Sequence, residues 1–167
     1  MRTLTGPSTG RRRSARRAAL PSMLALLVWA TPGVAQNNLG QLLDAGGTLM
    51  KQDEFKQELV QRVLVGPTPS GGGIELMYTS AGTIQGVGSL PGTPGGRMFG
   101  SSPYNGVWTD GENGTVCATM NVTAAGGGVA TTLPRRCQFW FRLGDRYYLS
   151  DSDSDRSVKV LVRTIKP

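Results

Sequence analysis

Three carboxylates at alternate positions form the most suggestive chemical motif of the sequence. Asp151, Asp153 and Asp155 are separated by serines, which matches the spacing of the first ligands in a calcium-binding EF-hand loop. That loop needs Gly at its sixth position and a bidentate Glu at its twelfth, where this chain has Arg156 and Val162. We therefore reject an EF-hand. A weaker cation site remains as the alternative to an acidic turn whose side chains hydrogen-bond the local backbone.

The other reactive side chains do not form a recognisable catalytic set. The chain contains no His, which excludes Ser-His and Cys-His nucleophiles and His-ligated zinc or haem. Asp110, Glu112 and Asp145 fall in expected turns, where acids more often serve the turn than general acid-base catalysis. The sequence has no Ser-x-x-Lys motif and no nucleotide-binding glycine motif. We therefore expect neither an enzyme nor a cofactor.

The first 35 residues have the organisation of a secretory signal. Basic residues at the start precede an apolar stretch at 18–30, which is followed by a helix breaker and small residues that end at Ala35. This order predicts cleavage after Ala35 and a mature chain that begins at Gln36. The apolar stretch is shorter than the roughly 20 residues of a membrane-spanning helix, so we expect no transmembrane anchor. Arg16-Arg17 leaves the export route open between Sec and twin-arginine.

Cleavage would change the meaning of the net charge. The whole chain carries a formal charge of +7, but six of its 18 basic residues lie before Ala35 and all 11 acidic residues lie after it. The mature chain therefore carries a formal charge of only +1. We expect no nucleic-acid partner, because the basic character belongs to the export segment. The expected location is the periplasm or the exterior of a bacterial cell.

Cys117 and Cys137 are the only two cysteines. In an oxidising compartment an even pair predicts a structural disulfide, and the spacing is unlike the Cys-x-x-Cys of a redox site. Two cysteines also cannot provide a four-thiolate metal site. The disulfide would close a loop of about 20 residues, for which the chain-entropy model gives about 3 kcal/mol of stabilisation.

The spacing of apolar residues predicts a helical start followed by strands. A short helix is expected within 36–47 and a longer one over 49–62, where Phe55, Leu59 and Val63 form one stripe. Beyond residue 66 the chain is rich in Gly and Pro, which disfavours long helices. Strands are expected at 73–79, 82–86, 106–109, 115–122, 136–142, 146–150 and 157–164.

These elements predict one mainly β (α+β) domain over 36–167. We expect the N-terminal helix to pack on a bent antiparallel sheet or an incomplete small β-barrel of about six to eight strands. Two Gly- and Pro-rich spans, 87–103 and 124–134, are expected to be loops, which either move freely or bind a ligand.

Alternation along the strands assigns side chains to faces. Cys137, Phe139 and Phe141 share one face, and both cysteines are expected to point into the core. The expected core comprises Phe55, Leu59, Met77, Val107, Trp108, Val116, Phe139, Phe141, Tyr147, Leu149 and Val160.

The opposite face would carry Trp140 and Tyr148 next to Arg142 and Arg146. Exposed aromatic side chains beside arginine are typical anchors for a ligand or a protein partner. The alternative is that a helix or a long loop covers this face.

A series of short motifs runs through the mature chain. It comprises Leu42 to Gly46, Glu54, Tyr78, Gly82 to Gly86, Gly106-Val107-Trp108, Asp110-Gly111, Cys117, Cys137 and Gly144 to Tyr148. In this order the motifs resemble a family of small exported bacterial proteins of unknown function. The resemblance covers residues 40–150 and implies a lead helix, a Gly-x-Trp strand and one disulfide, but no catalytic residues. The spacing between the cysteines is longer here than in that pattern.

Together these patterns predict a non-catalytic binding module of the cell envelope, with a small apolar ligand, an envelope polymer or a protein as its partner. The alternatives are a structural or accessory envelope protein, and an inhibitor of a secreted hydrolase, by architectural analogy with small periplasmic inhibitor barrels. A cavity lined by apolar and aromatic side chains would favour a small ligand, whereas a flat, exposed Trp140 and Tyr148 patch would favour a protein partner.

Overall fold

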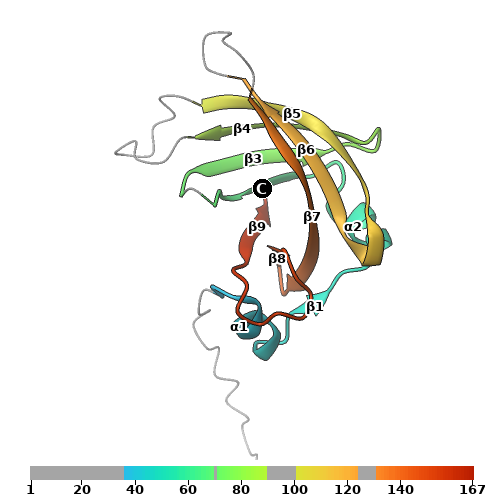
Figure 1. The fold of residues 1–167 in the computed structure, drawn as a ribbon, viewed down its shortest axis with the longest axis vertical. Helices are drawn as coiled ribbons and strands as arrows, with labels where there is room; N and C mark the ends of the chain where they lie inside the picture. The colour runs from blue at the N-terminus through green and yellow to red at the C-terminus, as the bar shows by residue number, and fades with distance from the viewer. Residues whose placement is uncertain (1–35, 70, 90–100, 124–130) are drawn as a thin grey trace, which may run out of the picture. The chain divides into compact units, whose positions relative to one another are not determined.

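The structure, a computed structural model, describes residues 36–69, 71–89, 101–123 and 131–167. These residues form a closed antiparallel barrel of eight strands with one further strand outside it (Figure 1). The helices are α1 (Leu39–Asp44) and α2 (Gln52–Glu58), and a 3-10 turn, η1, spans Glu112–Gly114. The strands are β1 (Thr48–Leu49), β2 (Val63–Pro67), β3 (Gly73–Tyr78), β4 (Thr83–Ser89), β5 (Ser101–Asp110), β6 (Val116–Val122), β7 (Thr131–Leu143), β8 (Arg146–Ser150) and β9 (Leu161–Ile165).

The length of β7 allows the barrel to close. The strands follow the order β7-β6-β5-β4-β3-β2-β9-β8, and β8 pairs back onto β7. The first part of β7 pairs with β6, as in Cys117 opposite Cys137, and its last part pairs with β8, as in Phe141 opposite Tyr148. β1 pairs with the end of β7 outside the ring. The prediction of a mainly β fold with an N-terminal helix is confirmed, and the barrel is complete.

The helix expected over 49–62 is shorter than predicted. It ends at Glu58, and Gln61 adopts a left-handed backbone conformation with φ of 68°. The chain then enters β2, a strand that was not expected, which pairs with both β3 and β9. Its ladder hydrogen bonds with two distant strands outweigh the local helical pattern. Val63 therefore belongs to β2 and is 38% exposed, outside the predicted helical stripe.

Parts of both predicted loop spans belong to strands. β4 continues to Ser89, β5 begins at Ser101 and β7 begins at Thr131. The Gly and Pro content misled the prediction here, because extended glycines are tolerated where strands bend closely past one another. The remaining residues of 87–103 and 124–134 lie outside the described residues, so the prediction that they form loops stays a prediction.

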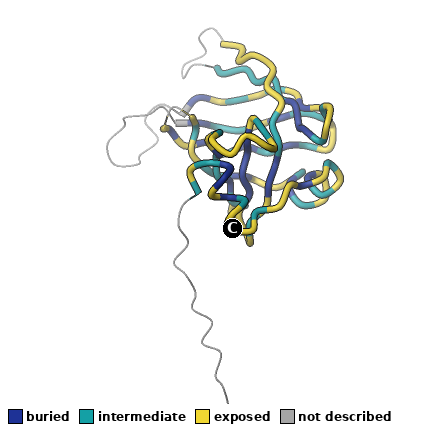
Figure 2. Tube along the Cα trace, turned by 60° about the horizontal axis from the view of Figure 1, so that its bottom comes forward, coloured by how far each residue is buried: buried dark blue, intermediate teal, exposed yellow. Residues whose placement is uncertain are grey.

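The buried apolar side chains form two layers, one inside the barrel and one on its outer surface. Figure 2 marks the buried positions along the chain in dark blue. Inside, Phe55 of α2 and Leu59, which follows the helix, are 1% and 0% exposed. Outside, Leu39 and Leu42 of α1 cover Phe141 and neighbouring side chains on β7 and β8. Of the residues expected in the core, Met77 and Val107 belong to neither layer, and Val107 is 55% exposed.

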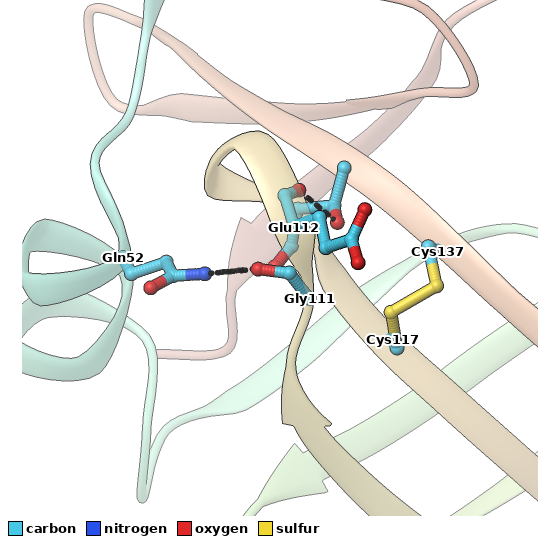
Figure 3. Close-up of a disulfide and its surroundings, with 6 residues drawn as sticks. Gln52, Gly111, Glu112, Cys117 and Cys137 are labelled. Atoms are coloured by element: carbon cyan, nitrogen blue, oxygen red, sulfur yellow. Dashed lines mark hydrogen bonds between the residues drawn. A yellow bond between two sulfur atoms is a disulfide. The ribbon is translucent and has the colours of Figure 1, made fainter.

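The disulfide between Cys117 and Cys137 is present, but the two cysteines do not point into the core (Figure 3). Cys117 neighbours Ala118, whose side chain faces the interior, so alternation turns the cysteines to the outer surface. Cys117 is buried while Cys137 is exposed. The disulfide therefore joins β6 to β7 from outside the barrel.

Side-chain contacts fix α2 against one end of the barrel. The amide of Gln52 donates to the backbone oxygen of Gly111 at 2.8 Å, next to the disulfide (Figure 3). Lys56 pairs with Asp110 at 2.6 Å. Glu58 accepts hydrogen bonds from Arg142 at 2.6 Å and from the Tyr147 hydroxyl at 3.1 Å. These contacts hold the buried face of α2 over the barrel end, which α2 closes.

Candidate ligand-binding cavity

The barrel contains a cavity of about 760 Å³ at the end away from α2. Its lining includes Thr68 and Pro69 after β2, Val122 at the end of β6 and Thr131 at the start of β7. These positions lie at the opposite strand ends from the β5–β6 turn that contacts α2. Ligand-binding cavities typically span about 300–1,000 Å³, so this cavity could enclose a small organic molecule.

Three inward-facing glycines lie on the strands that form one wall of the cavity. Gly66 and Gly88 lie on either side of Ile74 in the sheet, and Gly86 lies opposite Leu76. Ile74 and Leu76 line the cavity, and residues opposite each other share a face, so the three glycines face inward as well. Side chains normally fill the interior of an eight-stranded barrel. A Cβ atom at any of the three glycines would lie 2.2 Å from a neighbouring atom, so the glycines allow the wall to pack closely around the cavity.

The surroundings of Gly88 show how closely the interior is built. A Cβ atom at Gly88 would overlap the ring of Tyr104, which lies on the next strand and lines the cavity. Gly66 has the same relation to Arg163, because a Cβ atom there would lie 2.8 Å from Nη1 of the guanidinium. Each glycine thus accommodates a large polar side chain beside the cavity.

A cluster of aromatic rings forms the floor of the cavity. Phe55 packs against Tyr78, Trp108 and Trp140, with ring centroids 5.3, 5.5 and 5.1 Å apart. Tyr78 also lines the cavity, so it connects the floor to the space above. Burial raises the pKa of Tyr78 to about 12, and the nearby Arg163 acts in the opposite direction. The phenol is therefore neutral at physiological pH and keeps its O–H as a hydrogen-bond donor.

Arg163 is the buried charge of the interior. It lies on the inner face of β9 and is 5% exposed. Its Nη1 donates to the backbone oxygen atoms of Pro67 and Val162, each at 2.8 Å. Its Nε has no hydrogen-bond partner among the described residues, and the same is true of the indole nitrogen of Trp140. Burial lowers the pKa of Arg163, but the guanidinium stays charged at neutral pH.

No carboxylate neutralises Arg163 within the described part of the chain. The ion pairs found there join other residues. The arginine therefore brings a positive charge into an apolar interior, and its hydrogen-bond partners among the described residues are two backbone oxygen atoms.

The mouth of the cavity is more polar than its floor. Arg136 and Gln138 line it, and both donate to the Asp151 carboxylate, at 3.0 Å from Arg136 Nε and 2.9 Å from Gln138. Burial alone would raise the pKa of Asp151, but these hydrogen bonds hold it below its usual range. A second hollow of about 560 Å³ shares Arg136 and Gln138 and extends beside Lys159.

The three carboxylates of the alternative cation site, Asp151, Asp153 and Asp155, do not form a metal-binding group in the described part of the chain. Asp151 is held by Arg136 and Gln138, whereas Asp155 accepts hydrogen bonds from the backbone and hydroxyl of Ser157. Among the described residues, no group of three or more His, Cys, Asp or Glu side chains could hold a metal ion. The segment fits the alternative of an acidic turn, with Asp151 facing the barrel mouth.

The predicted exposed patch of Trp140, Tyr148, Arg142 and Arg146 does not exist. Trp140 faces the interior opposite Leu149, and Tyr148 lies on the outer face beneath α1, so the two aromatic side chains are on different faces. They are 1% and 2% exposed.

The two arginines of that expected patch also have different surroundings. Arg142 pairs with Glu58 at the closed end of the barrel. Arg146 is exposed at the start of β8. The alternative expectation was that a helix or a loop covers these side chains. Helix α1 does cover Tyr148, whereas Trp140 is buried because the barrel closes.

The sequence analysis missed Arg163 and the inward glycines. A usable signal was present on β9, where Leu161, Arg163 and Ile165 alternate. A cation between two apolar residues on one face of a strand indicates a charge directed toward the core. The valines at 158, 160 and 162 concealed it, because the outer face of β9 is apolar as well.

Comparison with family models, with curated proteins and with solved structures gives no match to this chain. The helices of the described residues are all too short or too polar to cross a membrane. The functional argument therefore rests on the cavity itself.

Proposed function

We propose that the mature chain is an exported, non-catalytic binding protein that encloses a small, largely apolar ligand inside its barrel. The observation that carries this proposal is the cavity of about 760 Å³, whose walls include Ile74, Leu76, Met120 and Leu161. Apolar side chains that line such a cavity lack packing contacts on the cavity side. A ligand that fills it would recover those contacts.

A protein partner has less support than a small ligand. The aromatic patch that would have served as its anchor is buried. The large apolar side chains exposed among the described residues are Leu49, Val63, Val107 and Leu133, which lie on four different strands. Single exposed apolar residues are normal on a protein surface.

A non-catalytic role agrees with the chemistry of the cavity. Its described lining contains hydroxyl, amide and guanidinium groups but no carboxylate and no thiol. Such a set can orient a ligand but lacks a general base. Export agrees with the disulfide, because disulfides form and persist in oxidising compartments.

Binding of the fluorescent apolar probe N-phenyl-1-naphthylamine would test the proposal. We expect the wild-type protein to increase the fluorescence of the probe. Ala118→Phe should reduce the increase, because Ala118 lines the cavity and the added ring would occupy part of the space that the probe needs. Thr119→Phe is the matched control, since Thr119 is the next residue on β6 and faces outward. No fluorescence change with wild type, or equal changes with both variants, would contradict the proposal.

A further inference from the structure

We infer that the ligand of the cavity is an amphiphile with an apolar body and a single carboxylate, and that Arg163 binds the carboxylate. This inference rests on the proposed binding function and specifies the class of ligand. It follows from the charges that line the cavity, from the hydrogen bonds that Arg163 lacks, and from the apolar walls above it.

The charge of the cavity lining is entirely positive. Arg135, Arg136 and Arg163 line the cavity, whereas none of the described lining residues is acidic. The mature chain as a whole is nearly neutral, so this imbalance is local. A cavity with positive charges and low-dielectric walls attracts anions and repels cations.

Arg163 is the arginine best placed to bind an anion inside the barrel. Arg136 already pairs with Asp151, and Arg135 is exposed to solvent at the mouth. Arg163 is almost completely buried, and both of its side-chain hydrogen bonds leave from Nη1. The Nε side of the guanidinium therefore has no acceptor among the described residues.

A buried charge without a counter-charge is destabilising, and an incoming anion would relieve that cost. A carboxylate suits the guanidinium, because its two oxygen atoms match two parallel N–H donors. Tyr78 lines the same cavity, and Arg163 lies close enough to influence the ionisation of its phenol. Its neutral hydroxyl would add a third donor to the carboxylate.

The rest of the lining requires an apolar body. Ile74 and Leu76 on β3, Met120 on β6 and Leu149 on β8 surround the space above Arg163. An alkyl chain or a fused apolar ring system would contact these walls and extend toward the mouth. Burial of each additional methylene contributes about 0.8 kcal/mol, so affinity should rise about fourfold per methylene until the cavity is filled.

Three ligands of equal chain length separate the roles of head group and body. Dodecanoate, dodecan-1-ol and dodecylamine would be titrated, at neutral pH and below micelle formation, into the full-length protein recovered from a bacterial host and loaded with the apolar probe. We expect dodecanoate to bind about tenfold tighter than the alcohol or better, and the amine to bind weakest. Arg163→Met should reduce the preference for acid over alcohol to about one, while the affinity for the alcohol is kept.

Arg146→Gln is the matched control, because it removes an exposed arginine that is not among the residues lining the cavity. It should keep most of the preference for the acid. Arg163→Lys, which keeps the charge but loses the planar fork, should retain only part of it.

The outcomes distinguish this inference from the proposed function. If wild type binds dodecanoate and dodecan-1-ol equally, the carboxylate inference is wrong and the binding function stands. If wild type binds none of the three ligands and no probe, the binding function itself is wrong. Unchanged preference in Arg163→Met would also overturn the assignment of Arg163. The wild-type ratio of acid to alcohol needs no variant, so it decides the head group even if Arg163→Met does not fold.

Discussion

Two individual residues, Arg163 and Tyr78, set the polarity deep in the cavity. Each is buried, and each interacts electrostatically with the other. Arg163 brings a charge and Tyr78 brings a hydroxyl group into walls that are otherwise mostly apolar. Because Tyr78 is buried here, its ionisation can be measured to test the surroundings of this part of the cavity.

Stability should fall in alkaline solution because of Tyr78. The pKa of Tyr78 is about 12 in the folded protein, against about 10 for an exposed phenol. Between these values the unfolded chain loses a proton that the folded protein retains, so the free energy of unfolding decreases as pH rises from about 10 to about 12, by about 2–3 kcal/mol in all. Urea unfolding at a series of alkaline pH values would measure this decrease.

Tyr78→Phe provides the control for that experiment. It removes the phenol and should make the alkaline decrease smaller, although the raised pKa of Tyr147 leaves part of it. An identical pH dependence in the variant and the wild type would show that Tyr78 ionises normally.

At the scale of elements, α2 stabilises the barrel as an end plug and not as a long amphipathic helix. It has only seven residues, and its buried side chain is Phe55, which reaches the aromatic cluster. Isolated helices of this length are unstable in water, so contacts with the barrel must hold it.

Phe55→Ala should therefore destabilise the protein strongly. The substitution removes the ring that contacts Tyr78, Trp108 and Trp140, and truncation of a buried Phe typically costs about 3–5 kcal/mol. Lys56→Ala, at the next position, breaks an exposed ion pair with Asp110 and should change stability little. Chemical unfolding of both variants tests this contrast, and equal effects would contradict the role of α2 as a plug.

The disulfide is the second feature that stabilises the arrangement of the elements. It closes a sequence separation of 20 residues between β6 and β7. Replacing both cysteines by serine should lower the free energy of unfolding by about 3 kcal/mol and leave a folded protein, because the strands remain paired. Thermal unfolding with and without reductant would measure the effect. Equal transition temperatures in the two conditions would refute a stabilising role.

At the scale of the whole molecule, the barrel closes on itself and still leaves a hollow. Closure pairs β7 with β8, so the ring of strands around the cavity is continuous. Binding to the folded state alone would stabilise it, by about 2.7 kcal/mol at a ligand concentration of 100 times Kd.

Mass spectrometry of the protein recovered from a bacterial periplasm tests export, disulfide formation and ligand binding in one sample. We expect a denatured mass that begins at Gln36 and is two hydrogen atoms lower than that of the reduced chain. We also expect an additional native mass that disappears on denaturation. A denatured mass that retains Met1 would contradict cleavage, and a native mass equal to the denatured mass would argue against a tightly held ligand.

Much of the local structure was predictable from the sequence. The strands at 73–79, 115–122 and 146–150 correspond closely to β3, β6 and β8, since alternation and turn residues are local signals. The short first helix was predictable from local signals as well. The pairing of Cys117 with Cys137 was predictable because the chain has only two cysteines. The cavity was not predictable, because it depends on the closure of distant strands into a barrel.

The sequence by itself determined where most strands run and which residues alternate along them. Only the tertiary structure decided which face of each strand is inside. α1 covers the outer face of β7 and β8, so Phe141 and Tyr148 are buried outside the barrel while Trp140 and Leu149 are buried within it. Alternation is a property of a single extended backbone, whereas burial depends on which distant elements cover each face. The position of Arg163 beside the cavity is therefore a consequence of barrel closure.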